Sequence, residues 1–268
     1  MNKFFKNKKF IVGSIISIFF LMMALVGLWF TPWDPNAMSS TLKFASPSFQ
    51  HILGCDNFGR DIFSRLMTGL SKTLLIAVGT NVIGILFGII VGALTGYFGG
   101  VIDTVLMRFN DAVLAFPSIL LALLFISIFG PGQYNVMFAL GIVFIPSYAR
   151  IIRGEYLVCR NMDYVRSAKI MGASNIRIMF VHIFPNVYKI ILTTAVIGLN
   201  NAILAEAGLS FLGIGVQPPD SSLGSMLSDS QTYIFSHPSY AFFVGFFMVL
   251  MIIGFAVLSD GIKEVVEK

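Results

Sequence analysis

Long apolar runs alternate with short polar stretches over the whole length of this chain. Six such runs stand out, at residues 10–30, 73–98, 104–129, 136–152, 190–212 and 240–259. Their lengths are close to the roughly 20 residues that an α-helix needs to cross the hydrocarbon core of a bilayer. Pro117 and Pro146 are expected to bend the third and fourth helices, because proline removes a backbone hydrogen bond. The pattern predicts an all-α integral membrane protein with six transmembrane helices.

The second run carries a regular stripe of glycines. Gly84, Gly88, Gly92 and Gly96 recur every fourth residue, which places them on one face of a helix. Small residues allow helix backbones to approach closely in lipid. We therefore expect this face to pack against a neighbouring helix.

Composition and charge support a membrane protein and give it an orientation. Apolar residues make up 56% of the chain and charged residues 12%, which excludes an ordinary soluble domain. The apolar run at 10–30 is longer than a signal-peptide core and no small-x-small cleavage site follows it, so we expect the first membrane helix there. With the N-terminus inside, fourteen Lys and Arg lie on the inner side and four on the outer side. This asymmetry predicts that both termini are cytoplasmic.

The residue types give little support to other classes of function. The basic residues lie at helix ends rather than on one face, so the net charge of +5 does not indicate a nucleic-acid partner. His51, His182 and His237 lack the spacing of metal ligands. Cys55 and Cys159 are predicted on opposite sides of the membrane, so no disulfide between them is expected.

The polar loop at 163–186 carries the densest positive charge in the middle of the chain. Its punctuation predicts two short helices. Asp163 can cap the first, at 164–171, and Gly172 follows it where a positive φ often ends a helix. Ser174 can cap the second helix, and Pro185 is expected to stop it.

The first of these short helices is predicted to be amphipathic. Tyr164, Ala168 and Met171 follow helical spacing and share one face. The polar residues Arg166, Ser167 and Lys169 lie away from that face. The loop is therefore predicted to form a small knob on the cytoplasmic side, with an ordinary solvated connection between two membrane helices as the alternative.

The loop resembles the coupling loop of ABC-importer permeases. That pattern is an E-A-A-like triplet, three residues, a Gly, nine residues and I-x-L-P; here the triplet is 166–168, the glycine is Gly172, and the end is 182–185 with Phe184 in place of Leu. The fuller string Y-V-R-S-A-K-I-M-G-A-S-N-I-R is similar to the branch that imports dipeptides, oligopeptides and nickel, in its second, C-type membrane subunit. The resemblance implies contact with an ATPase through Tyr164, Val165, Ala168, Met171, Gly172, Ala173, Arg177 and Pro185.

Two further stretches resemble the same branch. Residues 51–66 follow H-x-L-G-T-D-x-x-G-R-D-x-x-S-R-L, with Cys55 in place of Thr, and residues 209–227 follow its L-S-F-L-G-x-G-x-x-P-P segment, with Leu223 where Trp is common. Asp56, Arg60 and Asp61 are expected to form a local ion-pair cluster. The alternative is a docking role for an external binding protein.

The resemblance implies a complete transport assembly. It would have the type I ABC-importer permease fold, a second homologous permease, two cytoplasmic ATPase subunits and an extracytoplasmic substrate-binding protein, in the cell membrane of a prokaryote. The chain has no phosphate-binding loop of its own, since Ser71 stands where Gly must precede the Lys in G-L-S-K-T at 69–73. ATP and Mg would therefore be bound by the partner ATPases, and the chain is not expected to be an enzyme. We divide it into 1–72, a membrane helix with an extracytoplasmic segment, and 73–268, a five-helix core with the coupling loop at about 154–189.

Two other mechanisms compete with a permease. A secondary transporter driven by an ion gradient would have paired repeats and several buried carboxylates, and Glu206 is the one candidate. A membrane enzyme would cluster a nucleophile and a base, or metal ligands. Glu206, near the outer part of the fifth span, is predicted to line the outer mouth of the path or to reach the interface as a helix-end residue. Whether the cargo is a peptide, nickel or a metal chelate is left open.

Overall fold

The computed structural model describes residues 6–266, so Lys3 and Lys268, which count toward the predicted inner charge, lie outside it. All the regular elements in the described part of the chain are helices, and its one β-type pairing is an isolated bridge between Cys55 and Asp61. Five helices are long and apolar enough to cross a membrane, and a bent pair brings the number to six if it counts as one span. The prediction of a six-span helical protein agrees with this arrangement.

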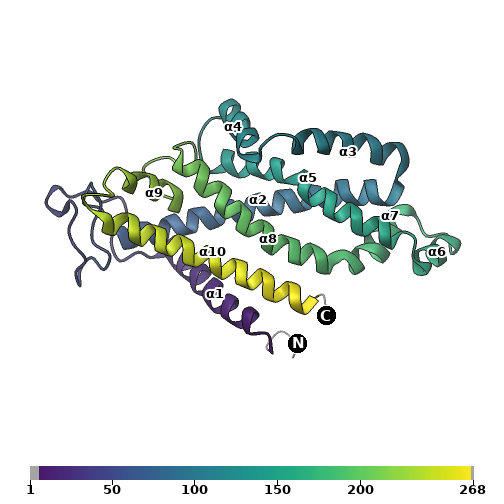
Figure 1. Ribbon diagram of the computed structural model, residues 1–268, viewed down its shortest axis with the longest axis horizontal. Helices are drawn as coiled ribbons and strands as arrows, with labels where there is room; N and C mark the ends of the chain where they lie inside the picture. Colours follow the sequence, from purple (N-terminus) through teal and green to yellow (C-terminus); the bar gives the residue numbers. More distant parts are fainter. Residues whose placement is uncertain (1–5, 267–268) are drawn as a thin grey trace.

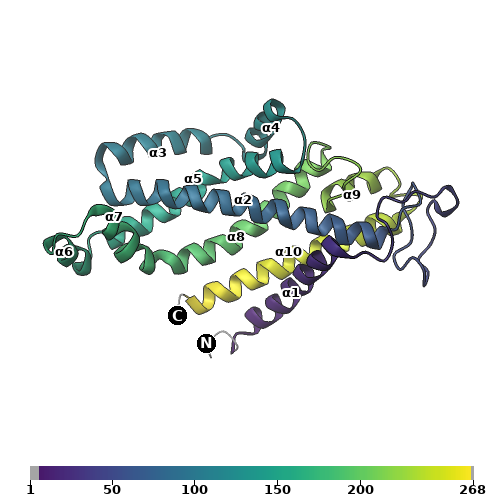
Figure 2. The same ribbon diagram turned by 180° about the vertical axis from the view of Figure 1, so that it is seen from behind.

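Apart from the long segment between the first two, the helices follow one another with short connections. In order they are α1 (Lys8–Trp29), α2 (Ile62–Phe98), α3 (Gly100–Leu114), α4 (Ser118–Phe129), α5 (Gln133–Cys159), α6 (Asp163–Ile170), α7 (Asn175–Arg177), α8 (Phe184–Phe211), α9 (Leu223–Gln231) and α10 (Pro238–Val266). Figure 1 shows α2, α5 and α8 running along the length of the molecule, and Figure 2 shows the same bundle from behind. The segment 31–61 and α9 lie at one end, and α6 and α7 lie at the other.

The glycine stripe of α2 packs against α5, as predicted, and these two helices form the most extensive pair in the bundle. A Cβ atom at Gly88 would lie 2.4 Å from Cβ of Tyr148, and one at Gly96 would lie 2.5 Å from Cβ of Tyr156. Both distances are too short for real atoms, so these two glycines are needed for the helices to approach this closely. The closely packed pair of α2 and α5 is therefore part of the framework that positions the functional elements.

The first and last helices pack side by side along the bundle. A Cβ atom at Gly13 would lie 2.3 Å from the backbone nitrogen of Leu258, so α1 and α10 are in direct backbone contact there. The Lys9 ammonium lies 2.5 Å from Glu264 near the two chain ends. The N-terminal helix is therefore held by the C-terminal one.

The third span is broken rather than merely bent. Helices α3 and α4 meet at an angle of 91° next to Pro117, where the sequence predicted a bend. Helix α3 is fastened to α5 by two ion pairs, Asp103 with Arg153 and Asp111 with Arg150, each with N–O distances of 2.5 Å. The corner between α3 and α4 stands beside α5 and helps to enclose a cavity.

Several predicted boundaries were wrong. Helix α2 begins at Ile62, not at residue 73, because Asp61 accepts a hydrogen bond from the Ser64 backbone and caps a helical turn that is too polar for a hydropathy pattern to reveal. The predicted division of the chain at residue 72 therefore falls inside α2. Helix α9, at Leu223–Gln231, occupies a stretch where no helix was predicted.

Candidate functional site

The short helices α6 and α7 form a knob at one end of the molecule (Figure 1). Ser174 caps α7 as predicted, since its side chain accepts from the Arg177 backbone, and Gly172 has the predicted positive φ of +79°. The predicted cap at Asp163 is wrong. Helix α6 begins at Asp163 itself, and the Asp163 carboxylate lies 3.6 Å from Arg166, a favourable pair one turn along the helix.

Pro185 does not stop the second short helix, contrary to the prediction. A π-helical turn at Ile178–Ile183 follows α7 and leads directly into α8, so that residues 175–211 form one continuous helical rod. Pro185 lies in the first turn of α8. Because proline has no N–H to donate, the rod lacks one backbone hydrogen bond at this position, next to the π-helical turn. The knob is therefore joined to α8 with no loop between them.

One face of α6 anchors the knob to the bundle. Val165 and Ala168 are buried in an apolar cluster with Tyr156, Ile178 and Met179. The predicted face of Tyr164, Ala168 and Met171 is thus divided, because Ala168 points inward while Tyr164 and Met171 are exposed. Val165 and Ala168 are packing residues in this chain.

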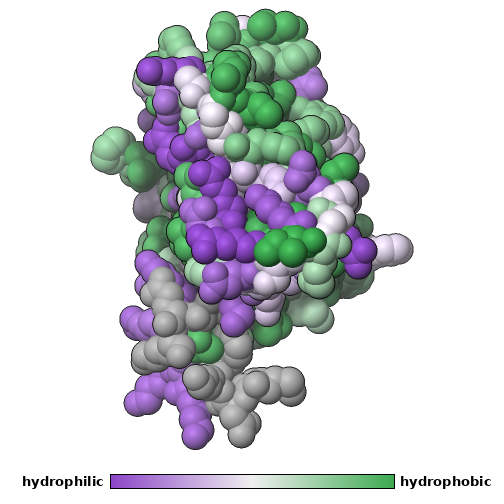
Figure 3. All heavy atoms as spheres, turned by 90° about the vertical axis from the view of Figure 1, so that its right-hand side faces the viewer, coloured by the Kyte–Doolittle hydropathy of each residue, from purple (hydrophilic) through white to green (hydrophobic). Residues whose placement is uncertain are grey.

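The tip of the knob exposes apolar side chains. Ile170 is 87% exposed, Met171 79% and Ile176 72%. Figure 3 looks onto this end of the molecule, where hydrophobic residues lie among hydrophilic ones. Ile170 and Ile176 were missed, although their position on either side of the G-A-S turn was a signal. An exposed apolar group of this kind indicates a surface that binds a partner.

The other predicted contact residues surround this tip. Gly172, Arg177 and Pro185 are exposed, and Ala173 is half-buried. The knob is also tied to the end of α2, because the Tyr97 hydroxyl hydrogen-bonds Oδ1 of Asn175 at 2.8 Å and the Lys169 ammonium lies 5.2 Å from the centre of the Tyr97 ring. These contacts fix the orientation of the knob relative to the membrane helices.

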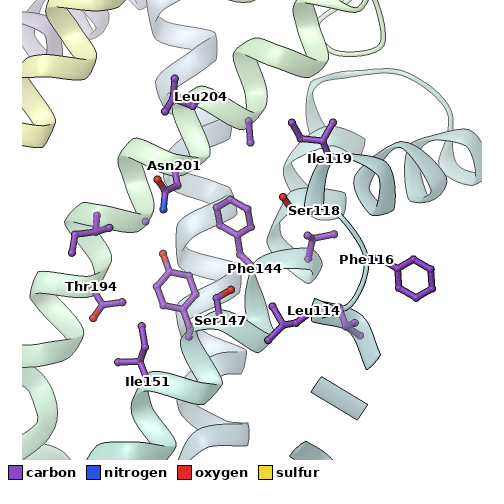
Figure 4. Close-up of a pocket in the computed structure, with 16 residues that line it drawn as sticks. Leu114, Phe116, Ser118, Ile119, Phe144, Ser147, Ile151, Thr194, Asn201 and Leu204 are labelled. Atoms are coloured by element: carbon purple, nitrogen blue, oxygen red, sulfur yellow. The ribbon is translucent and has the colours of Figure 1, made fainter. Parts of the chain in front are cut away.

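A cavity of about 440 Å³ lies between the α3–α4 corner, α5 and α8. Figure 4 shows Phe144, Ser147 and Ile151 of α5 on one side, and Thr194, Asn201 and Leu204 of α8 on the other. Leu114, Ser118 and Ile119 close it from the third side, while the Phe116 ring points away from it. Among the residues that the structure describes, none that lines this cavity is charged.

The polar groups of the cavity fall into two kinds. The Thr194 hydroxyl donates to the Ile190 carbonyl at 2.7 Å, and the Tyr148 hydroxyl is hydrogen-bonded to Asn81, whose amide donates to the Ala195 carbonyl at 2.7 Å. These groups join helices or satisfy the backbone. The side chains of Ser118, Ser147 and Asn201, in contrast, have no hydrogen-bond partner within residues 6–266. Unpaired polar groups are costly in lipid, so these three are placed to face water, cargo or another protein.

Glu206 does not line this cavity, although its neighbours Leu204 and Ala205 do. Its side chain is fully buried, and the Ser210 hydroxyl donates to one carboxylate oxygen at 2.6 Å. Thr73 of α2 and Ser222 beside α9 are the other polar groups near the carboxyl group. The side chain points into protein. The hypothesis of a helix-end residue required it to reach the membrane interface, and it does not.

The segment 31–61 contains a buried ion-pair cluster. Nε of Arg60 donates to Asp56 at 2.6 Å, as predicted, and Nε of Arg65 lies 3.7 Å from the same carboxylate. Asp61 was expected in this cluster but pairs with His51 instead, at 2.9 Å. All five side chains are buried, which the sequence did not indicate because such groups are mostly exposed.

Two nearby groups have altered acidity. Burial raises the pKa of the Cys55 thiol to about 11, and the negative charges of Asp61 and Asp56 act in the same direction. Burial also raises the pKa of the Asp229 carboxyl above its ordinary value, against the opposing effect of Arg65 and Arg60. Asp229 lies on α9, 3.8 Å from Nη2 of Arg60, so the cluster connects α9 to the segment 31–61.

Comparison with known proteins gives consistent matches over nearly the whole chain. The model of the family described as binding-protein-dependent transport system inner membrane component matches residues 84–268, and that of the N-terminal TM domain of oligopeptide transport permease C matches residues 1–47. A dipeptide transport system permease protein of Alkalihalophilus pseudofirmus is 37% identical over 98% of this chain and 86% of its own length.

Two more relatives and one solved structure extend the comparison. A probable D,D-dipeptide transport system permease protein of Escherichia coli is 34% identical, and a glutathione transport system permease protein of Pectobacterium atrosepticum is 35% identical, each over 96% of this chain and 86% of its own length. A chain of the methionine ABC transporter MetNI, in inward-facing conformations, aligns with a TM-score of 0.59 and 17% identity over 74% of this chain and 94% of that chain. At this identity the structural match supports a common fold.

Proposed function

This chain belongs to the family of binding-protein-dependent transport system inner membrane components, and from that premise we propose that it forms half of the path of a peptide importer. It is a permease subunit of an ABC importer in the prokaryotic inner membrane. The observation that carries the proposed path is the uncharged cavity between α5 and α8, with its three unpartnered polar side chains. A cavity of about 440 Å³ is within the range of small-molecule sites.

The proposed cargo is a short peptide. Relatives at 34–37% identity are named for dipeptide and D,D-dipeptide transport, and one at 35% for glutathione, which supports a peptide over nickel or a metal chelate. An uncharged wall suits peptides because their side chains vary in charge while their main chain does not. Selection among peptides is then made mainly by the external binding protein, which delivers them to the path.

The knob is the proposed contact with the ATPases. Its exposed Ile170, Met171 and Ile176 would insert into a groove on a cytoplasmic ATPase subunit, and Tyr164, Gly172, Ala173, Arg177 and Pro185 would surround that contact. Val165 and Ala168 would transmit force to α5 and to the continuous rod of residues 175–211 through the packing they make. This assignment places the knob and both chain ends in the cytoplasm.

The remaining partners complete the proposed assembly. A second homologous permease would supply the other half of the path, two ATPase subunits would bind ATP and Mg, and the segment 31–61 with α9 would face the binding protein. Residues 1–72 and 73–268 would then serve as an outer attachment and a transport core that share α2. Glu206 would hold α8 to α2 and α9 near the outer mouth, since its carboxyl group lies beside Thr73 and Ser222.

The experiment compares two matched substitutions in the complete transporter. Met171→Asp should weaken copurification of the ATPase subunits and lower ATP-driven uptake of tri-alanine into proteoliposomes by tenfold or more, because it places a charge in an apolar contact. Ile52→Asp alters an exposed apolar residue at the opposite end and should leave ATPase binding unchanged. The purified chain alone should hydrolyse no ATP.

Three results would contradict the proposal. The first is normal ATPase binding by Met171→Asp, and the second is an equal loss of ATPase binding in Ile52→Asp. The third is failure of the intact parent transporter, with its binding protein, to take up any peptide of two to five residues. Retention of transport with both substitutions would make the loop at 163–186 an ordinary connection.

A further inference from the structure

The three unpartnered polar side chains of the cavity differ in what they can bind. Ser118 and Ser147 each donate and accept through a single hydroxyl oxygen, whereas Asn201 carries an N–H donor and a C=O acceptor on separate atoms and can use both toward one peptide group. A peptide group also carries one C=O acceptor and one N–H donor. The side-chain amide of an asparagine can therefore donate to the peptide carbonyl and accept from the peptide N–H. Asn201 is the residue of the cavity whose chemistry matches a peptide main chain most fully.

The position of Asn201 supports this match. It projects from α8 into the cavity, and Ser147 projects from α5 on the facing side (Figure 4). Gly198 lies one turn before Asn201 on the same wall, where a Cβ atom would overlap the Tyr148 hydroxyl, so the wall is kept flat beside the amide. Asn201 is exposed on this wall and has the apolar side chains of Phe144 and Leu204 beside it, so its amide is accessible to a cargo molecule.

We propose that Asn201, assisted by Ser147, is a contact site for the main-chain amide of the cargo and determines that the path accepts peptides irrespective of side-chain charge. This inference rests on the proposed function and deepens it. The charge independence follows from the absence of charged groups among the described residues that line the cavity. Recognition then depends on the one neutral group that every peptide carries.

The test is a double-substitution experiment on cargo and protein. The complete transporter, with its ATPases and binding protein in proteoliposomes, is given tri-alanine or an analogue in which an ester replaces one of its two peptide amides and removes that N–H donor. The protein is the parent, Asn201→Leu, Ser147→Ala or the control Thr193→Val. Thr193 lies on the same helix, α8, but it is buried away from the cavity and its hydroxyl is already bonded to the Lys189 carbonyl. The binding protein is the same throughout, so its own preference cancels between variants.

Asn201→Leu should lower uptake of tri-alanine about two- to tenfold, the scale of one hydrogen bond, and should lower uptake of the ester analogue less. Ser147→Ala should have a smaller effect in the same direction, and Thr193→Val should change the uptake of neither cargo. Asn201→Asp should shift the ratio of Ala-Lys-Ala to Ala-Glu-Ala uptake about two- to fivefold toward the lysine peptide, the scale of an exposed ion pair.

Four outcomes would overturn the inference. These are equal loss of uptake of both cargoes in Asn201→Leu, a cargo-selective loss in Thr193→Val, a failure of Asn201→Asp to change the charge ratio, and a loss of the second permease from purified Asn201→Leu complexes. The last would assign Asn201 to contact between subunits. In all four, uptake of peptide by the parent remains, so the proposed function stands; absence of that uptake is the separate result that removes both.

Discussion

The segment 31–61 and the loop 163–186 have similar sequences in general character but opposite structures. Both are polar stretches between apolar runs. The first buries Asp56 with Arg60, and Asp61 with His51, although its Asp34 and Lys43 are exposed. The second leaves Ile170 and Met171 exposed and keeps its charged groups on the surface. A polar segment can satisfy its own side chains within the chain, or it can leave apolar side chains exposed for a partner. Whether its charged groups are buried distinguishes these two kinds of segment.

The physical reason lies in the cost of each group without its partner. A buried carboxylate that loses its cation costs several kcal/mol, so the segment 31–61 is stable only while its own pairs are intact. An exposed isoleucine costs little in the isolated chain, and its burial contributes about 25 cal/mol per Å² only when a partner arrives. Substitutions in the two regions should therefore separate effects on folding from effects on assembly.

The largest expected difference concerns two aspartates. Asp56→Ala removes the carboxylate shared by Arg60 and Arg65, leaves two buried guanidinium groups without it, and should lower the free energy of unfolding by about 3–5 kcal/mol. Asp163→Ala removes a side chain that is 97% exposed and should change stability by less than about 0.5 kcal/mol. Thermal unfolding in detergent measures both. Equal stability of the two variants would end the distinction between the regions.

A smaller effect is expected for two histidines. His51→Ala leaves the buried Asp61 carboxylate without one of its hydrogen bonds and should cost about 1–3 kcal/mol. His182→Ala changes a half-buried side chain in the π-helical turn and should cost clearly less. Urea-induced loss of fluorescence from Trp33, which stacks near His51, reports on the first region. A larger cost for His182→Ala would show that the loop is the more self-contained segment.

The third comparison tests backbone conformation in the loop. Gly172 has φ of +79° with open space around it, so Gly172→Ala should cost about 1–2 kcal/mol from backbone strain alone. Gly154, in the interior of α5, also has open space but no positive φ, so Gly154→Ala should be neutral or stabilise by up to about 1 kcal/mol. Proteolysis near the loop and thermal unfolding distinguish a local from a global change. Opposite signs for the two glycines are the expected outcome.

The last effect is absent at neutral pH and appears only at high pH. The folded pKa of Cys55 is raised to about 11 from an ordinary value of 9.0, so the folded state holds the thiol proton more tightly than the unfolded chain. The resulting stability is fully present below pH 9 and is lost as the pH rises to about 11. Cys55→Ala should flatten the curve of unfolding free energy against pH in that range. A curve unchanged by Cys55→Ala would mean that the thiol titrates normally.

The sequence predicted those parts of the structure that depend on neighbouring residues. The apolar runs, the glycine stripe from Gly84 to Gly96, the positive φ of Gly172 and the cap at Ser174 all follow from local composition or spacing. The start of α2 at Ile62 was missed because its first turns include Arg65 and Lys72, which hide a helix from a hydropathy pattern.

Features that join distant parts of the chain were not predicted. Asn201 and Ser147 lie on helices that are separated in sequence by the whole loop 163–186, so no spacing rule brings them together. Pro185 was misplaced because a proline that ends one helix and a proline that begins the next have the same local sequence. The burial of Asp56 and Glu206 depends on how helices from several regions meet, which a single sequence does not specify.

The pairing of α1 with α10 has a consequence for how the protein is made. The ribosome produces α1 first and α10 last, so the surface around Gly13 waits in the membrane until nearly all of the chain has been synthesised. Contacts between residues so far apart in sequence form late. During that interval the small-residue face of α1 is free to pack against other helices, and it becomes covered when α10 packs against it. A nascent chain truncated before Pro238 is therefore the form most open to capture by membrane chaperones or proteases.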